Sequence, residues 1–118
     1  MKKFLMLFLI GAGLSVSAQA KDAMCKITLN NQMVVNNTCS FSPIDVDGSF
    51  VLSGKYGLYE DIQAFKVVLI DKGIAKSYVS GEDGTWNGWG KAIRSKSQPA
   101  CWNGKIGSTR YQICAFAK

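Results

Sequence analysis

Short runs rich in Val, Ile, Phe and Tyr recur along the chain after residue 20, and Gly, Asn and Asp separate them. Apolar residues nowhere keep a helical spacing for three turns in this part, so the pattern predicts an antiparallel all-β protein. Eight such runs favour a small barrel or sandwich. The expected strands are Met24–Leu29, Gln32–Asn36, Ser49–Ser53, Ala64–Ile70, Ile74–Ser80, Trp89–Arg94, Ala100–Lys105 and Thr109–Phe116.

The segment Asp71-Lys72-Gly73 separates two of these strands and predicts a hairpin. Gly73 stands where a type I turn followed by a bulge needs a left-handed residue. The first strand of this hairpin alternates between two largely apolar faces, one with Phe65, Val67 and Leu69 and the other with Lys66, Val68 and Ile70. We therefore expect this strand to be buried on both sides except near its start.

The first twenty residues have the layout of a secretory signal peptide. Two lysines precede an apolar run from Phe4 to Leu14, and the segment ends in Ala18-Gln19-Ala20, a typical cleavage site. The apolar run is too short to span a bilayer, so no retained membrane anchor is expected. We predict that residues 1–20 are removed and that residues 21–118 form one exported domain.

Four cysteines remain in that domain, at positions 25, 39, 101 and 114. An even number in an oxidising compartment predicts two disulfides, for which three pairings exist. A small domain gains much from such covalent links, because its core alone supplies little net stability.

Hairpin registers select one pairing. A turn at Gly107-Ser108 places Cys101 opposite Cys114 in a non-hydrogen-bonded pair, where Cα atoms lie about 4.5 Å apart and a disulfide fits. A rival turn at Asn103-Gly104 would instead place Cys101 opposite Ile106. We prefer the first turn.

At the other end of the domain, a hairpin centred on Gln32 places Cys25 opposite Cys39, although a bulge would shift this register by one residue. The predicted disulfides are therefore Cys25–Cys39 and Cys101–Cys114.

The net charge of +6 falls to +4 once Lys2 and Lys3 leave with the signal peptide. Basic residues are spread along the chain apart from Lys91, Arg94 and Lys96, so a nucleic-acid footprint is weak. An acidic protein partner or an anionic cell-wall polymer fits an exported protein better.

The chain contains no histidine, which excludes a Ser-His-Asp triad, a Cys-His pair and the commonest zinc ligand. The remaining candidate acids and bases are carboxylates in loops bounded by Gly or Pro, where turn residues that cap the backbone are the usual interpretation. These pairs are Asp45 and Asp47, Glu60 and Asp61, and Glu82 and Asp83. The first pair is similar to the start of a calcium loop, but the later ligands are missing. We expect no enzyme activity, no metal and no cofactor.

Aromatic residues are the most suggestive candidates for binding. Tyr56 and Tyr59 lie in GKYGLYE, and Trp86 and Trp89 lie in the Gly-rich stretch TWNGWGK, which predicts a loop. Aromatic rings with Asn amides nearby are typical of saccharide sites. Trp102 is adjacent to Cys101, and a tryptophan beside a disulfide is expected in the core.

The run KAIRSK that follows has two interpretations. Its cations, Lys91, Arg94 and Lys96, would protect an edge strand from pairing with other sheets. Alternatively, they would approach acidic groups of a partner, such as the paired carboxylates of an enzyme that cleaves glycans.

The chain as a whole resembles two groups of small exported β-proteins of Gram-negative bacteria: periplasmic lysozyme inhibitors, and immunity proteins against cell-wall-degrading type VI secretion effectors. The shared layout is a signal peptide, a short β-domain and two disulfides. C-type lysozyme inhibitors carry Ser-Gly-x-x-Tyr and a later Lys-Gly-x-x-Ala. The nearest matches here are Ser53-Gly54-Lys55-Tyr56 and Lys72-Gly73-Ile74-Ala75, each one residue short.

The resemblance implies a periplasmic protein that inhibits a muralytic enzyme by inserting loops into its active-site cleft. The implied partner-binding residues are Ser53, Lys55, Tyr56 and Tyr59 in one loop and Glu82, Asp83, Trp86, Trp89 and Lys91 in the other. The alternative hypothesis is a carbohydrate- or peptidoglycan-binding module that uses Trp86, Trp89 and Trp102. A hydrolase built on a carboxylate pair is the least favoured hypothesis.

Overall fold

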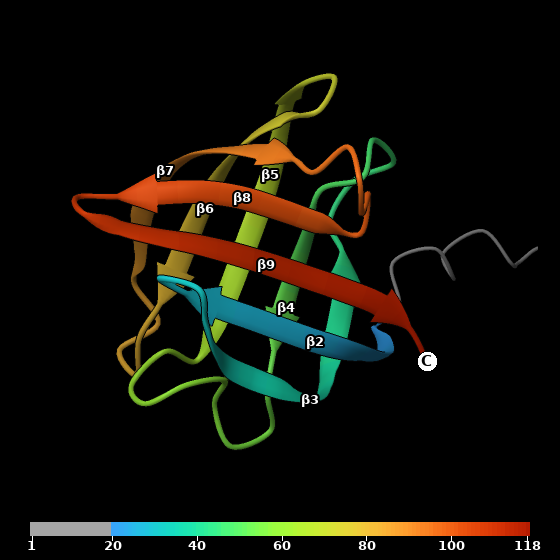
Figure 1. The fold of residues 1–118 in the computed structure, drawn as a ribbon. Coiled ribbons are helices and arrows are strands. Elements are labelled where there is room, and N and C mark those ends of the chain that lie inside the picture. Colours follow the sequence, from blue (N-terminus) through green and yellow to red (C-terminus); the bar gives the residue numbers. More distant parts are fainter. Residues whose placement is uncertain (1–19) are drawn as a thin grey trace, which may run out of the picture.

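Eight antiparallel strands close into a barrel in the computed structural model, which describes residues 20–118 (Figure 1). The predicted signal peptide therefore lies outside the described residues except for Ala20. Each strand pairs with the next one along the chain, and the last pairs with the first. The strands are β2 (Lys21–Leu29), β3 (Gln32–Pro43), β4 (Phe50–Ser53), β5 (Ala64–Asp71), β6 (Ile74–Ser80), β7 (Trp86–Arg94), β8 (Cys101–Ile106) and β9 (Thr109–Ala117).

Every strand expected from the sequence overlaps one of these, which confirms the all-β prediction and selects the barrel over the sandwich. The largest differences are at β3, which continues from Asn36 to Pro43, and at β7, which begins at Trp86. The part of the stretch TWNGWGK that was expected to form a loop before Trp89 is therefore strand from Trp86 onward, and that prediction is wrong. Asn87 pairs with Val79 and Gly88 pairs with Tyr78, so cross-strand pairing overrides the turn preference of an Asn-Gly dipeptide.

The strands alternate between one buried and one exposed face. In β5, Phe65 and Val67 are buried, whereas Ile70 is 54% exposed. The expectation that this strand is buried on both sides is wrong, because a closed barrel has a single interior and none of the strands within residues 20–118 forms a second layer over its outer wall. The core cluster is made of the inward residues Ala23, Cys25, Ile27, Val35, Cys39, Phe50, Leu52, Phe65, Val67, Ala75, Val79, Ala92, Trp102, Tyr111 and Ile113.

The β5–β6 hairpin turns at Lys72 and Gly73, since Asp71 already pairs with Ile74. Gly73 has a φ of 70°, the left-handed conformation that its position predicted. The register shifts between Leu69 and Asp71, so the bulge lies inside the strand rather than in the loop.

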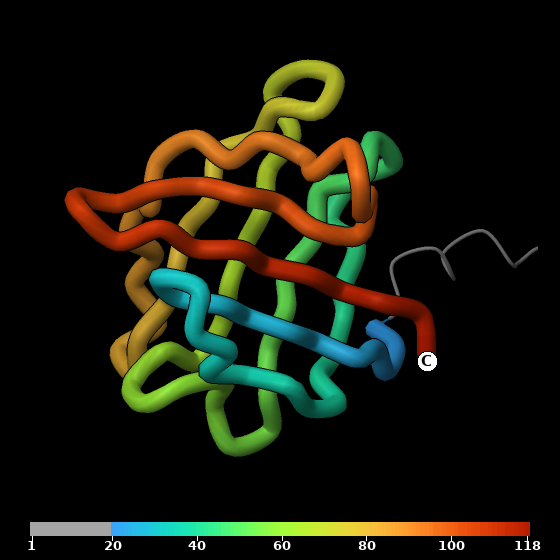
Figure 2. Tube along the Cα trace, viewed as in Figure 1, coloured from blue at the N-terminus to red at the C-terminus, as the bar shows by residue number. Residues whose placement is uncertain are grey.

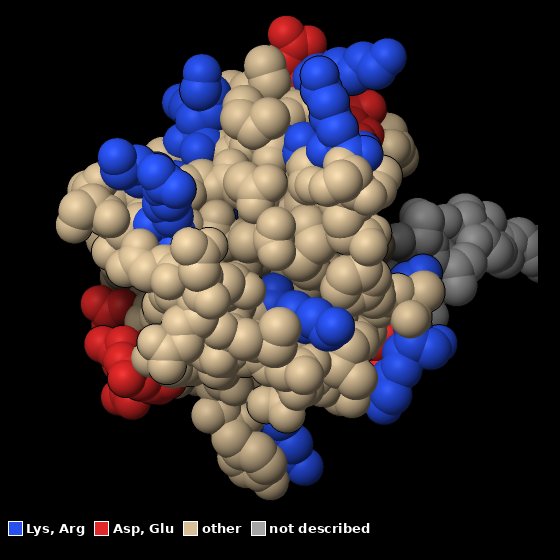
Figure 3. All heavy atoms as spheres, viewed as in Figure 1, with Lys and Arg blue, Asp and Glu red and all other residues tan. Residues whose placement is uncertain are grey.

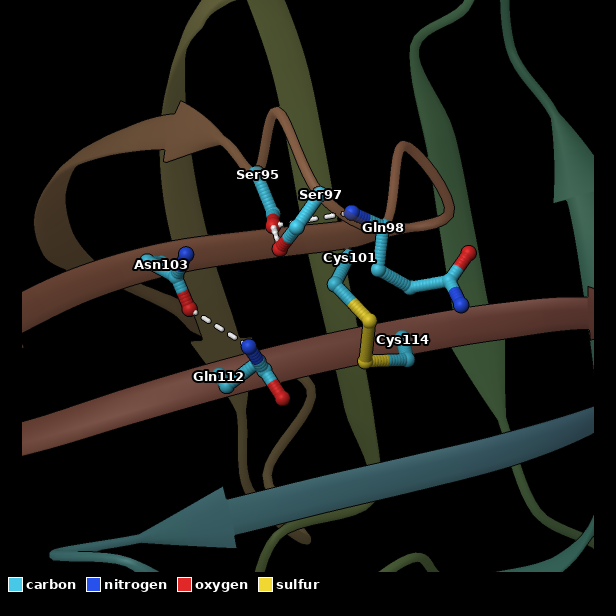
Figure 4. Close-up of a disulfide and its surroundings, with 7 residues drawn as sticks. All are labelled: Ser95, Ser97, Gln98, Cys101, Asn103, Gln112 and Cys114. Atoms are coloured by element: carbon cyan, nitrogen blue, oxygen red, sulfur yellow. Dashed lines mark hydrogen bonds between the residues drawn. A yellow bond between two sulfur atoms is a disulfide. The ribbon is translucent and has the colours of Figure 1, made fainter.

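The β8–β9 hairpin has the predicted register. Cys101 lies directly opposite Cys114, and the two are joined by a disulfide with a Cα–Cα distance of 4.0 Å. The turn falls at Gly107-Ser108, where Gly107 has a φ of 60°. This disulfide lies on the outer wall, and the segment 95–100 folds beside it (Figure 4). Ser95 N–H donates to the Cys101 carbonyl, which helps to hold this segment in place.

The β2–β3 hairpin has the predicted disulfide but not the predicted register. It turns at Asn30-Asn31, so Cys25 lies opposite Asn37 rather than Cys39. That turn alone would place Cys25 opposite Asn36, and a register shift of one residue after Ile27 changes the partner to Asn37. Cys39 therefore lies opposite Ala23, two residues from Cys25 on the same face. The Cys25–Cys39 bridge therefore joins diagonal neighbours, with a Cα–Cα distance of 5.8 Å. Both cysteines belong to the barrel core, so one disulfide lies inside the wall and the other outside it.

The connections divide between two ends of the barrel. One end, here the loop end, holds segments 54–63 and 81–85 and the short turns at 30–31 and 107–108. The opposite end holds segments 44–49, 72–73 and 95–100 together with both ends of the domain (Figure 2). The two longest connections of the loop end are those in which the sequence predicted partner-binding residues.

Candidate functional site

Two loops that are distant in sequence lie side by side at the loop end. Gln63 N–H donates to the Ser80 carbonyl at 2.8 Å, which joins the base of segment 54–63 to the start of segment 81–85. A Cβ placed on Gly81 would lie 3.7 Å from the Asp61 carbonyl oxygen. Seven of the nine predicted partner-binding residues are on these loops or at the adjoining strand ends: Ser53, Lys55, Tyr56, Tyr59, Glu82, Asp83 and Trp86.

Tyr56 is at the apex of a tight turn. Gly57 N–H donates to the Gly54 carbonyl at 3.2 Å, and a Cβ on Gly54 would lie only 2.2 Å from the Gly57 carbonyl oxygen. Only glycine fits at position 54 in this conformation. The Tyr56 side chain is 89% exposed, and the Lys55 ammonium lies 5.5 Å from its ring centroid. The turn thus presents an aromatic ring and a cation together on a constrained backbone.

The second half of the same loop is anchored to the barrel. Leu58 and Tyr59 both donate a backbone N–H to the Ile62 carbonyl, and Ile62 N–H donates back to the Tyr59 carbonyl. The side chains of these three residues pack against the core cluster. The negative charge of Glu60 raises the pKa of the Tyr59 phenol above its usual value. Tyr59 therefore contributes to holding the loop, while Tyr56 projects from it.

The 81–85 loop is a short acidic turn. Gly84 N–H donates to the Gly81 carbonyl, and Asp83 accepts a hydrogen bond from Thr85 N–H at 3.0 Å. Glu82 and Asp83 are exposed, as are Glu60 and Asp61 on the neighbouring loop. Figure 3 shows acidic side chains gathered at the lower left, where these loops lie in Figure 1. The loop end is therefore locally acidic where these two loops meet.

Asp45 has the backbone-capping role expected of a loop carboxylate. One of its oxygens accepts hydrogen bonds from the backbone N–H groups of Asp47 and Ser49. Hydrogen bonding from Ser49 lowers the pKa of the Asp45 carboxyl below its usual value. The Asp45–Asp47 pair thus orders segment 44–49, at the end opposite the candidate loops.

The three tryptophans are in three different environments. Trp102 is 1% exposed, as its position beside the disulfide predicted, and the Arg94 guanidinium lies 4.7 Å from its ring. Trp89 is half-buried and packs against the rings of Phe65 and Tyr111, with centroids 5.2 and 5.3 Å away. Trp86 is 37% exposed. The expected Gly-rich loop with two free tryptophans is therefore not present, because β7 directs Trp89 into the core.

The sequence alone missed Lys66, which lies between two rings. Its ammonium is 4.4 Å from the ring centroid of Trp86 and 5.0 Å from that of Tyr78. Lys66 and Tyr78 are direct cross-strand neighbours. The hairpin predicted from the loop 71–73 already places Lys66 opposite Tyr78. The register of that hairpin was therefore the signal from which this pair could have been predicted.

Lys91 is separated from the candidate loops. It lies on the outer wall within β7, directly opposite Lys76. Because β7 pairs with β6 on one side and β8 on the other, it is not an edge strand. Protection of a sheet edge is therefore the wrong explanation for the basic run that contains Lys91.

Within residues 20–118, no group of three or more Cys, Asp and Glu side chains could hold a metal ion. The same residues contain no helix that is long and apolar enough to cross a membrane. We found no match to this chain among protein-family models, curated proteins or solved structures.

Proposed function

We propose that the protein binds and inhibits a cell-wall-degrading enzyme, either a lysozyme-like hydrolase or a secreted effector, by inserting the loops of the loop end into its active-site cleft. The observation that carries this proposal is Tyr56, an aromatic side chain that is 89% exposed on a constrained turn. The second predicted loop lies at the same end of the barrel, beside the second half of segment 54–63.

The geometry suits an inhibitor for two energetic reasons. Exposed aromatic residues that become buried at an interface are typical hot spots, and their truncation costs about 2 kcal/mol or more. The turn and the Tyr59–Ile62 hydrogen bonds restrict the loop before binding, so little conformational entropy is lost on docking.

Lys55 supplies the electrostatic part of the proposal. Its ammonium lies beside the Tyr56 ring, so a ring that enters a cleft brings a cation with it. Glycan-cleaving enzymes have two carboxylates in that cleft, and a cation between them would neutralise the general base or nucleophile.

The two disulfides fit an oxidising compartment, as expected of a chain exported to the periplasm by a cleaved signal peptide. The alternative hypothesis, a glycan platform of three tryptophans, has less support. Trp102 is buried and Trp89 is half-buried against the core cluster, which leaves Trp86 as the most exposed indole.

The test uses the mature chain, residues 21–118, with its disulfides formed. Clearing of a peptidoglycan suspension is measured with a C-type lysozyme, a lytic transglycosylase and a peptidoglycan amidase. We expect inhibition of at least one enzyme, and we expect Tyr56→Ala or Lys55→Ala to raise the inhibitory concentration at least about tenfold.

The matched control is Val46→Ala. Val46 is 96% exposed but lies in segment 44–49 at the opposite end of the barrel, so this change should leave inhibition unaltered. Failure to inhibit any of the three enzymes, or equal inhibition by the Tyr56 and Val46 variants, would overturn the proposal.

A further inference from the structure

Four cations form a row across the outer wall of β6, β7, β8 and β9. Lys76 lies opposite Lys91, and Lys105 lies opposite Arg110. The β7–β8 pairing of Ala92 with Gly104, continued by one residue, brings Lys91 opposite Lys105. All four side chains are exposed. Figure 3 shows basic side chains gathered at the upper left, where β7 and the β8–β9 hairpin lie in Figure 1.

This arrangement has no evident structural benefit. Like charges placed directly opposite each other destabilise a sheet. The row beside it is uncharged and consists of Ile74, Ile93, Asn103 and Gln112, so no carboxylate in that row compensates the cations. A surface that retains such repulsion is suited to an anionic ligand, whose binding would relieve it.

A groove adjoins the row. It has a volume of about 390 Å³, and its lining includes Tyr78, Gly88 and the paired Lys76 and Lys91. Tyr78 lies directly opposite Gly88, and the Lys66 ammonium is 5.0 Å from the Tyr78 ring. The Tyr78 ring thus lies beside Lys66 and shares a groove with Lys76 and Lys91.

Gly88 adds no side chain to the lining of this groove. Its φ is not among the positive values, and a Cβ added to it would meet nothing within 4 Å. Neither backbone conformation nor packing requires glycine at this position. Glycine is nevertheless present, even though it weakens the interior of a strand. The missing side chain leaves space beside the Tyr78 ring.

We propose that this wall binds an acidic glycan. A sugar ring stacks on Tyr78 in the space above Gly88, and the carboxylate or phosphate groups of the chain lie along Lys76, Lys91, Lys105 and Arg110. Neighbouring strands are about 4.8 Å apart, so the row spans about 14 Å and can contact several anionic groups of one extended polymer.

Other polyanions fit less well. A peptide that binds by adding a strand needs an unpaired sheet edge, and the closed barrel has none. Two disulfides indicate an oxidising compartment, where nucleic acid is not the usual polyanion. The site also lies on the wall, so it does not include the Tyr56 turn that carries the inhibitor proposal.

The test measures binding of the mature chain to polygalacturonate, which supplies carboxylates, and to a phosphomannan, which supplies phosphates. Neutral dextran, a single-stranded oligothymidylate and ovalbumin, an acidic protein, are the comparison probes. We expect one of the two acidic glycans to bind most tightly, to weaken as salt is added, and dextran not to bind.

Three variants separate the effect of the site from the effect of net charge. The double change Lys76→Glu and Lys91→Glu should weaken glycan binding at least about tenfold, whereas Lys26→Glu on β2 should change it less than about twofold per charge. Gly88→Val leaves the charge unaltered and fills the groove. It should weaken binding at least about fivefold while the urea midpoint of unfolding stays the same or rises.

Specific results would contradict either the proposed site or the proposed class of ligand. The proposed location of the site would be overturned if the Lys26 variant and the Lys76–Lys91 variant lost equal glycan affinity per reversed charge. It would also be overturned if Gly88→Val bound the glycan as tightly as the unchanged protein. Tighter binding of the oligothymidylate or of ovalbumin than of either glycan would overturn the ligand class. Tyr56→Ala should retain glycan binding, so this proposal and the inhibitor proposal can fail separately.

Discussion

The two Trp-Asn-Gly units of the chain contain glycines with opposite structural requirements. A Cβ on Gly104 would lie 2.3 Å from Cζ and from the hydroxyl oxygen of Tyr111, whereas a Cβ on Gly88 would meet nothing within 4 Å. The substitutions Gly104→Ala and Gly88→Ala therefore make the same chemical change in the same tripeptide. We expect them to have very different effects on stability.

The magnitude for Gly104→Ala follows from how Tyr111 is held. The tyrosine is 2% exposed, its hydroxyl donates to the Trp89 carbonyl at 2.8 Å, and it is also hydrogen-bonded to the buried Ser77 hydroxyl. The ring cannot move away without losing these bonds. Overpacking costs about 1–3 kcal/mol, and a buried polar group left without a partner costs about 1–3 kcal/mol, so we expect a loss of about 2–6 kcal/mol.

Gly88→Ala should be neutral or stabilising by about 0.5–1 kcal/mol, because alanine loses less backbone entropy than glycine on folding. The assay is urea unfolding followed by tryptophan fluorescence with both disulfides intact. With a dependence of about 1–3 kcal/mol per molar urea, the two midpoints should differ by about 1 M or more.

A double variant tests the cause. In a Tyr111→Leu background the added methyl group of Gly104→Ala no longer meets the phenol, so its cost should fall below about 1 kcal/mol. Equal losses for the Gly88 and Gly104 variants, or an unchanged cost in the Tyr111→Leu background, would refute the reasoning.

Three further predictions concern stability. Burial raises the pKa of Tyr111 above its usual value of 10.0. The neutral phenol therefore contributes fully to the free energy of unfolding below pH 10, and this contribution is lost as the pH rises above that value. Tyr111→Phe should remove this loss of stability at alkaline pH while costing about 1–3 kcal/mol at neutral pH. Ser49 is 1% exposed and its hydroxyl accepts a hydrogen bond from Leu69 N–H at 2.9 Å, so Ser49→Ala should lower the free energy of unfolding by about 1–3 kcal/mol, and an unchanged urea midpoint would contradict this. Replacing Cys101 and Cys114 by serine should cost about 2–4 kcal/mol, measured in the same assay.

Local patterns predicted the strands and the C-terminal hairpin well. The turn at Gly107-Ser108 and the Cys101–Cys114 pair both follow from strand alternation and one glycine that needs a left-handed conformation. The N-terminal disulfide was predicted correctly from a wrong register. The turn lies at Asn30-Asn31 rather than around Gln32, and the bulge after Ile27 recovers one residue of the difference, so Cys39 is a diagonal neighbour still within reach of Cys25.

The features missed from sequence depend on closure of the barrel. Lys76, Lys91, Lys105 and Arg110 look scattered along the chain, and only three successive strand registers align them. Trp89 looked free in a Gly-rich stretch, but β6 pairs with that stretch and turns its ring inward. By contrast, the positions of Tyr56 and the acidic 81–85 loop follow from the order of the strands. The two segments come after β4 and β6, which run in the same direction, so both lie at the loop end.

The position of the two disulfides bears on how the chain oxidises. Each bridge stays within one hairpin, with sequence separations of 14 and 13 residues. The mispaired alternatives, such as Cys39 with Cys101, would close loops several times longer, and the entropy cost of closure grows with loop length. We therefore expect the two native pairs to form early and without disulfide exchange. The pairing of β2 with β9, which closes the barrel, would then join two hairpins that are each already cross-linked by a disulfide.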